Sequence, residues 1–247
     1  RLHAFAADND SLEVVTSSEE LKQVLKSRED GSKLIAGLLG TEGSHALDGD
    51  LDNIKRLYDV GFRMMSLQHF FDNKLGGSLH GESNAGLTDF GRQAVRLMDS
   101  MGIMIDVSHS SPEVVDDVLN LIDSPLIVSH TGFKGHCDRK RNISDDLITR
   151  IAQRGGLIGV GFWSEAVCGT DVTAIADAIA YGTETFGVEA VALGSDWDGA
   201  VTTPIAANDL AYLTSALLKR GLSEDDIRAV MGGNTVRYFL EHLPTTD

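Results

Sequence analysis

Two stretches of the chain end in the same dipeptide, Ser-His: Gly102-Ile-Met-Ile-Asp-Val-Ser-His109 and Pro125-Leu-Ile-Val-Ser-His130. Both are apolar and rich in β-branched residues, which is typical of strands that are buried on both faces. Between them, Ser111-Pro112 has the residue types that begin a helix, and an apolar pattern continues to Ile122. A strand, a helix and a second strand in this order predict a parallel βαβ unit.

The two histidines, His109 and His130, mark one edge of this unit. Parallel neighbours point the same way, so both imidazoles are expected at the carboxyl edge of the sheet. Two histidines side by side can bind a metal or form a catalytic pair. A histidine after a strand can also be a hydrogen-bonded loop residue, and the pattern alone leaves these interpretations open. Asp106 alternates away from His109 along the strand, and we expect it to make a structural hydrogen bond.

Strand and helix patterns alternate along the whole chain. Strand patterns occur at 33–42, 62–69, 102–109, 125–130, 156–163 and 189–196, and helical patterns occur at 17–25, 51–58, 87–101, 111–122, 147–153, 172–186, 208–220, 223–231 and 234–243. No linker interrupts them, so we predict one α/β domain over residues 1–247, a TIM (β/α)8-type barrel. The rival, a doubly wound sheet, would need a Gly-rich phosphate turn, and Gly40-Thr-Glu-Gly43 is not one.

The number of strands falls short of a closed barrel. The sequence contains six long strand patterns, whereas the barrel needs eight. The opening residues, Arg1-Leu-His-Ala-Phe-Ala-Ala7, have the composition of a helix already under way. We therefore expect the first two strands to be absent and the domain to be incomplete at its N-terminus.

The composition narrows the class of partner. The 247 residues carry a formal net charge of −16, which argues against nucleic acid as a partner. Hydrophobic content of 42% is enough for a buried core. No apolar run approaches the roughly 20 residues of a membrane span, and no secretory signal pattern opens the chain. The sequence leaves the compartment open between cytoplasmic and secreted or periplasmic.

The predicted strand ends carry side chains suited to metal chemistry: Glu42, His69, His109, His130 and Asp196. Carboxylates and imidazoles are ligands that suit Zn²⁺. Two metals roughly 3.5–4 Å apart can share a carboxylate and hold a hydroxide near neutral pH, which fits hydrolysis of an amide. The sequence contains no Gly-x-Ser-x-Gly elbow and no Walker loop that would indicate a competing chemistry.

An ordered set of motifs resembles the membrane (renal) dipeptidase family of zinc metallopeptidases. The resemblance runs from about Val15 to the end of the chain. It is carried by Glu42-Gly-Ser-His-Ala-Leu47, Ser66-Leu-Gln-His69, Ile105-Asp-Val-Ser-His109, Val128-Ser-His130, Arg139-Lys-Arg-Asn142, Gly194-Ser-Asp-Trp-Asp-Gly199 and Gly233-Asn-Thr-Val-Arg-Tyr-Phe239. Each motif is weak by itself, and their order and spacing make the set specific. The resemblance implies hydrolysis of dipeptides through a hydroxide that bridges two zinc ions.

The resemblance implies a metal-binding role for three residues. Glu42 would bridge the two zinc ions, and His109 and His130 would complete the second zinc site. The family takes its other two zinc ligands from a His-x-Asp motif on the first strand, and no such motif precedes Glu42 here. This chain would then hold one zinc ion or none. A truncated, catalytically inactive remnant that binds at most one metal is the alternative to an active zinc dipeptidase.

The resemblance also implies substrate-handling roles. His69 would stabilise the oxyanion that develops on the substrate carbonyl. Arg141 would bind the terminal carboxylate of the dipeptide. Asp196 would hold the attacking water and pass its proton to the leaving amine. Outside the motifs, His80 is expected to face solvent.

Three further expectations follow. In the family, cysteines at the places of Cys137 and Cys168 can be bridged, which implies a possible disulfide; the spacing leaves two free thiols equally open. Family members are often dimers, so a homodimer is possible.

A metal-free barrel enzyme, such as a phosphate-sugar isomerase that uses Gly194-Ser195 as a phosphate turn, is a third function class. It leaves Glu42 and the histidines unexplained.

Overall fold

The structure, a computed structural model, describes residues 2–245, and its strands form two parallel sheets. The larger sheet has six strands in sequence order, β3 (Leu39–Thr41), β4 (Phe62–Ser66), β5 (Met104–Asp106), β6 (Ile127–Thr131), β7 (Leu157–Val160) and β8 (Val191–Leu193). The smaller sheet pairs β1 (Leu12–Val14) with β2 (Ile35–Gly37). Because every pairing is parallel, all strands of the larger sheet end at one edge.

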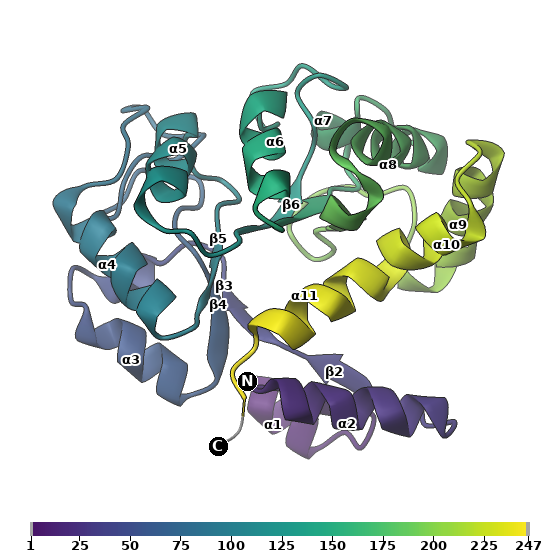
Figure 1. Ribbon diagram of the computed structural model, residues 1–247, viewed down its shortest axis with the longest axis horizontal. Coiled ribbons are helices and arrows are strands. Elements are labelled where there is room, and N and C mark those ends of the chain that lie inside the picture. Colours follow the sequence, from purple (N-terminus) through teal and green to yellow (C-terminus); the bar gives the residue numbers. More distant parts are fainter. Residues whose placement is uncertain (1, 246–247) are drawn as a thin grey trace.

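Helices connect the strands, and most of them lie around the outside of the larger sheet (Figure 1). The α-helices are α1 (Leu2–Ala7), α2 (Ser18–Glu29), α3 (Asp52–Asp59), α4 (Asp89–Ser100), α5 (Pro112–Leu121), α6 (Asp145–Gln153), α7 (Ser164–Val167), α8 (Val172–Phe186), α9 (Leu210–Lys219), α10 (Glu224–Arg228) and α11 (Asn234–His242). Short turns of other helix types lie at η1 (His45–Leu47), η2 (Val188–Ala190), η3 (Ala207–Asp209) and η4 (Ala229–Gly233). Among residues 2–245, none of the helices has the length and apolar content that crossing a bilayer requires.

The predicted βαβ unit is present as β5, α5 and β6. The Ser111 hydroxyl accepts a hydrogen bond from the Val114 backbone N–H at 3.1 Å, which caps the first turn of α5. Pro112 occupies the first turn, where its missing N–H costs nothing. The helix at α2 is capped in the same way, since Ser17 and Glu20 form the reciprocal pair of hydrogen bonds of a capping box.

Strands β5 to β8 of the larger sheet are largely buried on both faces, as their apolar sequences predict. One face packs under the surrounding helices as part of the main core, to which Ile105, Val128 and Ile158 contribute. The alternate residues face the other way and pack against α2 and α11: Met104, Ile127, Leu157 and Ala192 contact a cluster that includes Tyr238. Helix α11 therefore closes the inner side of the sheet and leaves the carboxyl edge for function (Figure 1).

The predicted barrel-type α/β fold is confirmed, with two differences in its strands. Strand β1 was not predicted, because Leu12-Glu-Val14 is too short to show an apolar run. The predicted strand at 33–42 is divided into β2, which pairs with β1, and β3, which pairs with β4. A register irregularity at Leu39/Gly40 accompanies that change of partner. In the described part of the chain, β8 pairs only with β7.

Candidate active site

The predicted site residues lie at the carboxyl edge of the six-stranded sheet. Glu42 directly follows β3, and His69 and His109 follow β4 and β5 in the loops. His130 lies within β6, and Asp196 follows β8. Parallel strands therefore deliver side chains from distant parts of the sequence to one place, as in barrels of this type.

The Glu42 carboxylate is the centre of this cluster. Its Oε1 atom lies 3.0 Å from His109 Nε2, 3.2 Å from His130 Nε2 and 3.7 Å from His69 Nε2. The two nitrogens His109 Nε2 and His130 Nε2 are themselves 2.9 Å apart. We call Glu42, His69, His109 and His130 the histidine cluster. Its nitrogen and oxygen atoms converge on one small volume, which is the arrangement that ligands of a cation require.

The environment keeps Glu42 and His109 in the protonation states that bind metal. The hydrogen bond from His109 and the neighbouring His130 ring hold the pKa of Glu42 well below its usual range, so the carboxylate is charged at neutral pH. Burial lowers the pKa of His109 to about 4, although the hydrogen bond to Glu42 opposes this shift. His109 is therefore a neutral imidazole at neutral pH, the form that can donate a lone pair to a metal.

Asp196 lies beside the histidine cluster. One of its carboxylate oxygens, an oxygen of Glu42 and a nitrogen of His130 all lie within 4.8 Å of one another. Burial raises the pKa of Asp196, and the negative charge of Glu42 adds to the increase. The backbone of Asp196 is left-handed (φ 58°), and so is that of His109 (φ 64°). Such a conformation is uncommon for residues with a side chain, and both residues adopt it in loops that carry the site.

Arg141 approaches from the loop after β6. Its Nη2 donates a hydrogen bond to the His130 carbonyl at 2.9 Å, and its guanidinium lies 5.3 Å from the Trp163 ring centroid. Its Nη1 is buried and has no partner among the described residues. Burial lowers the pKa of Arg141 to about 10, so the group remains charged at neutral pH. A buried cation with one unused nitrogen is suited to an anionic ligand group.

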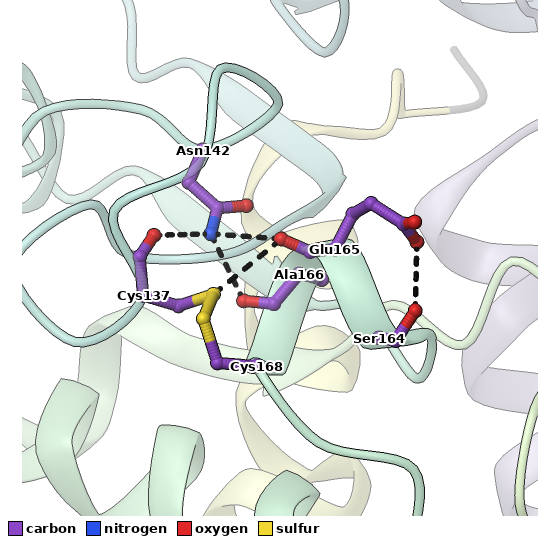
Figure 2. The surroundings of a disulfide bond; sticks show 6 residues. All are labelled: Cys137, Asn142, Ser164, Glu165, Ala166 and Cys168. Atoms are coloured by element: carbon purple, nitrogen blue, oxygen red, sulfur yellow. Dashed lines mark hydrogen bonds between the residues drawn. A yellow bond between two sulfur atoms is a disulfide. The ribbon is translucent and has the colours of Figure 1, made fainter.

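A disulfide and an asparagine hold the loop that carries Arg141. The sequence left the state of the two cysteines open, and in the structure Cys137 is joined to Cys168 (Figure 2). Beside the disulfide, Asn142 Nδ2 donates hydrogen bonds to the carbonyls of Cys137, Glu165 and Ala166 at 2.8, 3.2 and 3.0 Å (Figure 2). The loop after β6 is thereby tied to α7.

A cavity of about 260 Å³ opens above the histidine cluster. Its lining includes Glu42, His69, His109, Arg141 and Asp196, together with Phe70, His80, Trp163 and Glu165. The prediction for His80 was wrong: the residue is half-buried, and its Nε2 atom has no partner among the described residues. Burial lowers the pKa of His80. The loop that carries His80 has no periodic pattern, so no sequence signal placed it here.

The donor set fits a zinc ion. Two imidazole nitrogens and a carboxylate oxygen are typical zinc ligands, and the histidine cluster presents them from three different strand ends. The sequence does contain a His-x-Asp triplet, at His136–Asp138, but the His136 ring packs on Tyr181 and Cys137 is in the disulfide. That triplet therefore does not supply the ligand pair expected from a first strand.

Comparison with known proteins finds similarity to dipeptidases. The family model described as membrane dipeptidase (peptidase family M19) matches residues 1–243. Dipeptidase 3 of Homo sapiens is 30% identical over 250 residues, which cover 96% of this chain and 50% of that protein. Dipeptidase aclJ of Aspergillus oryzae is 32% identical over 221 residues, covering 85% of this chain and 52% of that protein. The chain thus spans about half the length of the curated relatives it matches.

A solved structure shares the fold. The amidohydrolase from Pseudomonas aeruginosa superposes with a TM-score of 0.85 and is 25% identical, and the match covers 98% of this chain and 82% of that one. The agreement extends through both sheets and the connecting helices, since nearly the whole chain is covered.

Proposed function

The chain belongs to the membrane dipeptidase family, peptidase family M19, and from this premise we propose that it hydrolyses the peptide bond of dipeptides with the help of zinc. The observation that carries the proposal is the convergence of Glu42, His109 and His130 on one point at the carboxyl edge of the sheet. The cavity above that point holds a buried arginine and a second carboxylate, which are the further groups that peptide hydrolysis needs.

Glu42, His109 and His130 would hold the metal. Glu42 would be shared between two ions in a complete site, and the described chain offers two donor groups around it, one with His69 and His109 and one with His130 and Asp196. Bound zinc would lower the pKa of a water molecule and polarise the peptide carbonyl. The charged state of Glu42 and the neutral state of His109 support this role.

The chain's own residues would bind the substrate and move its proton. Arg141 would pair with the free carboxylate of the dipeptide through its unpartnered Nη1. His69 stands at the cavity wall beside Glu42, where it would stabilise negative charge on the carbonyl oxygen. Asp196, whose pKa is raised by burial, would take a proton from the attacking water and deliver it to the leaving amine.

The test compares hydrolysis of an unblocked alanyl dipeptide by the zinc-loaded and the chelator-treated chain. We expect zinc-dependent turnover that Asp196→Asn reduces by about 100-fold or more, while zinc remains bound. Asp198→Asn is the matched control, since Asp198 is exposed on the same turn and should leave turnover unchanged. Full activity in Asp196→Asn, or turnover without metal, would contradict the proposal.

A protein that binds metal without catalysis is the second candidate. It is favoured by one observation: the His136–Asp138 triplet is not part of the histidine cluster. Metal stoichiometry separates the candidates. Two zinc ions per chain with hydrolysis support the dipeptidase, whereas a single ion without hydrolysis supports the non-catalytic protein. Sedimentation of the same sample tests the expected homodimer.

A further inference from the structure

Asp106, at the end of β5, is a buried carboxylate that the proposed chemistry does not use. It is 2% exposed. Its Oδ1 accepts hydrogen bonds from the backbone N–H groups of Ser108 at 2.9 Å and Ser129 at 3.0 Å. Its Oδ2 accepts a hydrogen bond from the Ser129 hydroxyl at 2.6 Å. The hydrogen bond from Ser129 is the shortest of the three, and in it the hydroxyl proton of Ser129 points toward Asp106.

That orientation determines what Ser129 can offer to its neighbour. Ser129 Oγ lies 2.9 Å from His130 Nδ1 and 3.0 Å from Ser108 Oγ. A hydroxyl has one proton, and the proton of Ser129 is already donated to Asp106. Ser129 Oγ can therefore only accept from His130, so Nδ1 of His130 carries a proton. In a neutral imidazole, Nε2 then has a free lone pair, and this is the atom that faces Glu42 and His109.

His109 is not oriented in this way. Its Nδ1 is buried and has no hydrogen-bond partner among the described residues. Its ring is instead directed by a left-handed backbone and by packing against His69, with ring centroids 4.7 Å apart. Of the two neighbouring histidines, only His130 is connected to a buried carboxylate through a hydroxyl.

We propose that Asp106 is a positioning residue which, through Ser129, holds His130 in the Nδ1–H form and so presents its Nε2 lone pair to the metal. Metal-bound histidines commonly need such a partner on the other ring nitrogen to fix the ring and its tautomer. The orienting part of this proposal concerns the metal-free protein. Only its effect on metal affinity rests on the proposed function.

The test is Asp106→Asn, which preserves the shape of the side chain and reverses the direction of its hydrogen bond with Ser129 Oγ. The amide oxygen can still accept from the two backbone N–H groups, but the amide nitrogen would donate to Ser129 Oγ. The Ser129 proton would then be donated to His130 Nδ1, which would move the imidazole proton to Nε2. The same substitution behind a catalytic histidine in serine proteases gives the wrong tautomer with the geometry intact.

Two readouts decide the outcome. Long-range ¹H–¹⁵N correlation spectra of the metal-free protein report which His130 nitrogen carries the proton, with His130→Gln used for assignment. We expect Nδ1–H in the unmodified protein and Nε2–H in Asp106→Asn. Competition with a chelator should show zinc binding about 10- to 100-fold weaker in the variant. The matched control is Asp145→Asn, because Asp145 also accepts a backbone N–H and a hydroxyl, those of Gly135 and Tyr181.

The proposal is overturned if His130 keeps Nδ1–H in Asp106→Asn, or if the unmodified protein already has Nε2–H. If Asp106→Asn does not fold, the pair Ser129→Ala and Ser129→Thr decides: the threonine hydroxyl should preserve Nδ1–H, and alanine should give a mixture of tautomers. An Nδ1–H signal equally strong in Ser129→Ala would overturn the proposal. A lack of zinc binding by the unmodified chain would count against the proposed function only, since the tautomer is read without metal.

Discussion

The two walls of the cavity are built in different ways. The histidine cluster stands on strand ends, where the parallel sheet fixes the backbone of each residue. Arg141 lies on a loop, residues 132–142, which has no strand or α-helix of its own. The Arg141 loop is held from outside, by the Cys137–Cys168 disulfide and by the three hydrogen bonds of Asn142 (Figure 2).

This difference indicates which property of each wall a substitution should disturb first. On the cluster side, the sheet fixes the backbone, and the charges are the sensitive feature, because three imidazole nitrogens lie within 4 Å of the Glu42 carboxylate. On the Arg141 side, the guanidinium remains protonated at neutral pH, so the charge is not the sensitive feature. The sensitive feature there is the position of the loop backbone. Substitutions in the cluster should therefore change chemistry first, and substitutions that loosen the loop should change stability and substrate binding first.

The largest effect is expected from Glu42→Gln. The amide has the same shape but removes the charge that attracts a cation, and it cannot be shared between two ions. We expect zinc affinity to fall by about 100-fold or more and dipeptide turnover to be lost, with stability little changed. Chelator competition measures the affinity. Glu165→Gln is the matched control, because Glu165 lines the same cavity but lies outside the cluster. An equal loss of zinc affinity in both variants would contradict the role of Glu42 as a zinc ligand.

The contrast between the walls also explains what could be predicted from sequence. Strand ends follow from apolar runs, and parallel pairing then brings Glu42, His109 and His130 together without further information. The position of His80 could not be inferred, because its loop is shaped by hydrogen bonds to Asp72 from the N–H groups of residues 78, 82 and 83. No periodic pattern carries such contacts.

The loop cysteines and Asp106 also show that sequence patterns do not predict which residues a side chain contacts. Whether Cys137 meets Cys168 depends on the distance between two loops, and their Cα atoms are 5.5 Å apart in the structure. The alternation along β5 correctly predicted a structural hydrogen bond for Asp106, but not which residue donates it. Sequence patterns fix the direction of a side chain relative to its own strand, whereas its partner depends on how the neighbouring strand is placed.

The second effect is expected from removing the disulfide with Cys137→Ser and Cys168→Ser together. The two cysteines are 31 residues apart in sequence, and closing a loop of this size contributes about 3.7 kcal/mol to the free energy of unfolding. Urea denaturation should show this loss. In the zinc-loaded protein, KM for an unblocked dipeptide should rise while kcat changes little, because Arg141 is less well held but the cluster is untouched.

Reducing agent provides the control for the disulfide. It should lower the stability of the unmodified protein to that of the double variant and leave the double variant unchanged. A double variant whose urea midpoint matches that of the oxidised protein would show that the hydrogen bonds of Asn142 suffice to hold the Arg141 loop. A fall in kcat without a rise in KM would contradict the separation of roles between the two walls.

The third effect is a pH dependence of stability to which His109 of the histidine cluster contributes. The pKa of His109 is lowered to about 4 in the folded protein, against an ordinary value of about 6.5 in the unfolded chain. Between these values the unfolded state binds more protons, so the metal-free protein should lose stability as pH falls, by at most about 1.4 kcal/mol per pH unit. Urea denaturation at several pH values in that window measures the slope. His109→Asn should remove this part of the slope. Arg141→Met should retain most of it, because burial is the main cause of the lowered pKa of His109 and the charge of Arg141 is a smaller one. An equal slope in all three proteins would place the pH sensitivity outside the cluster.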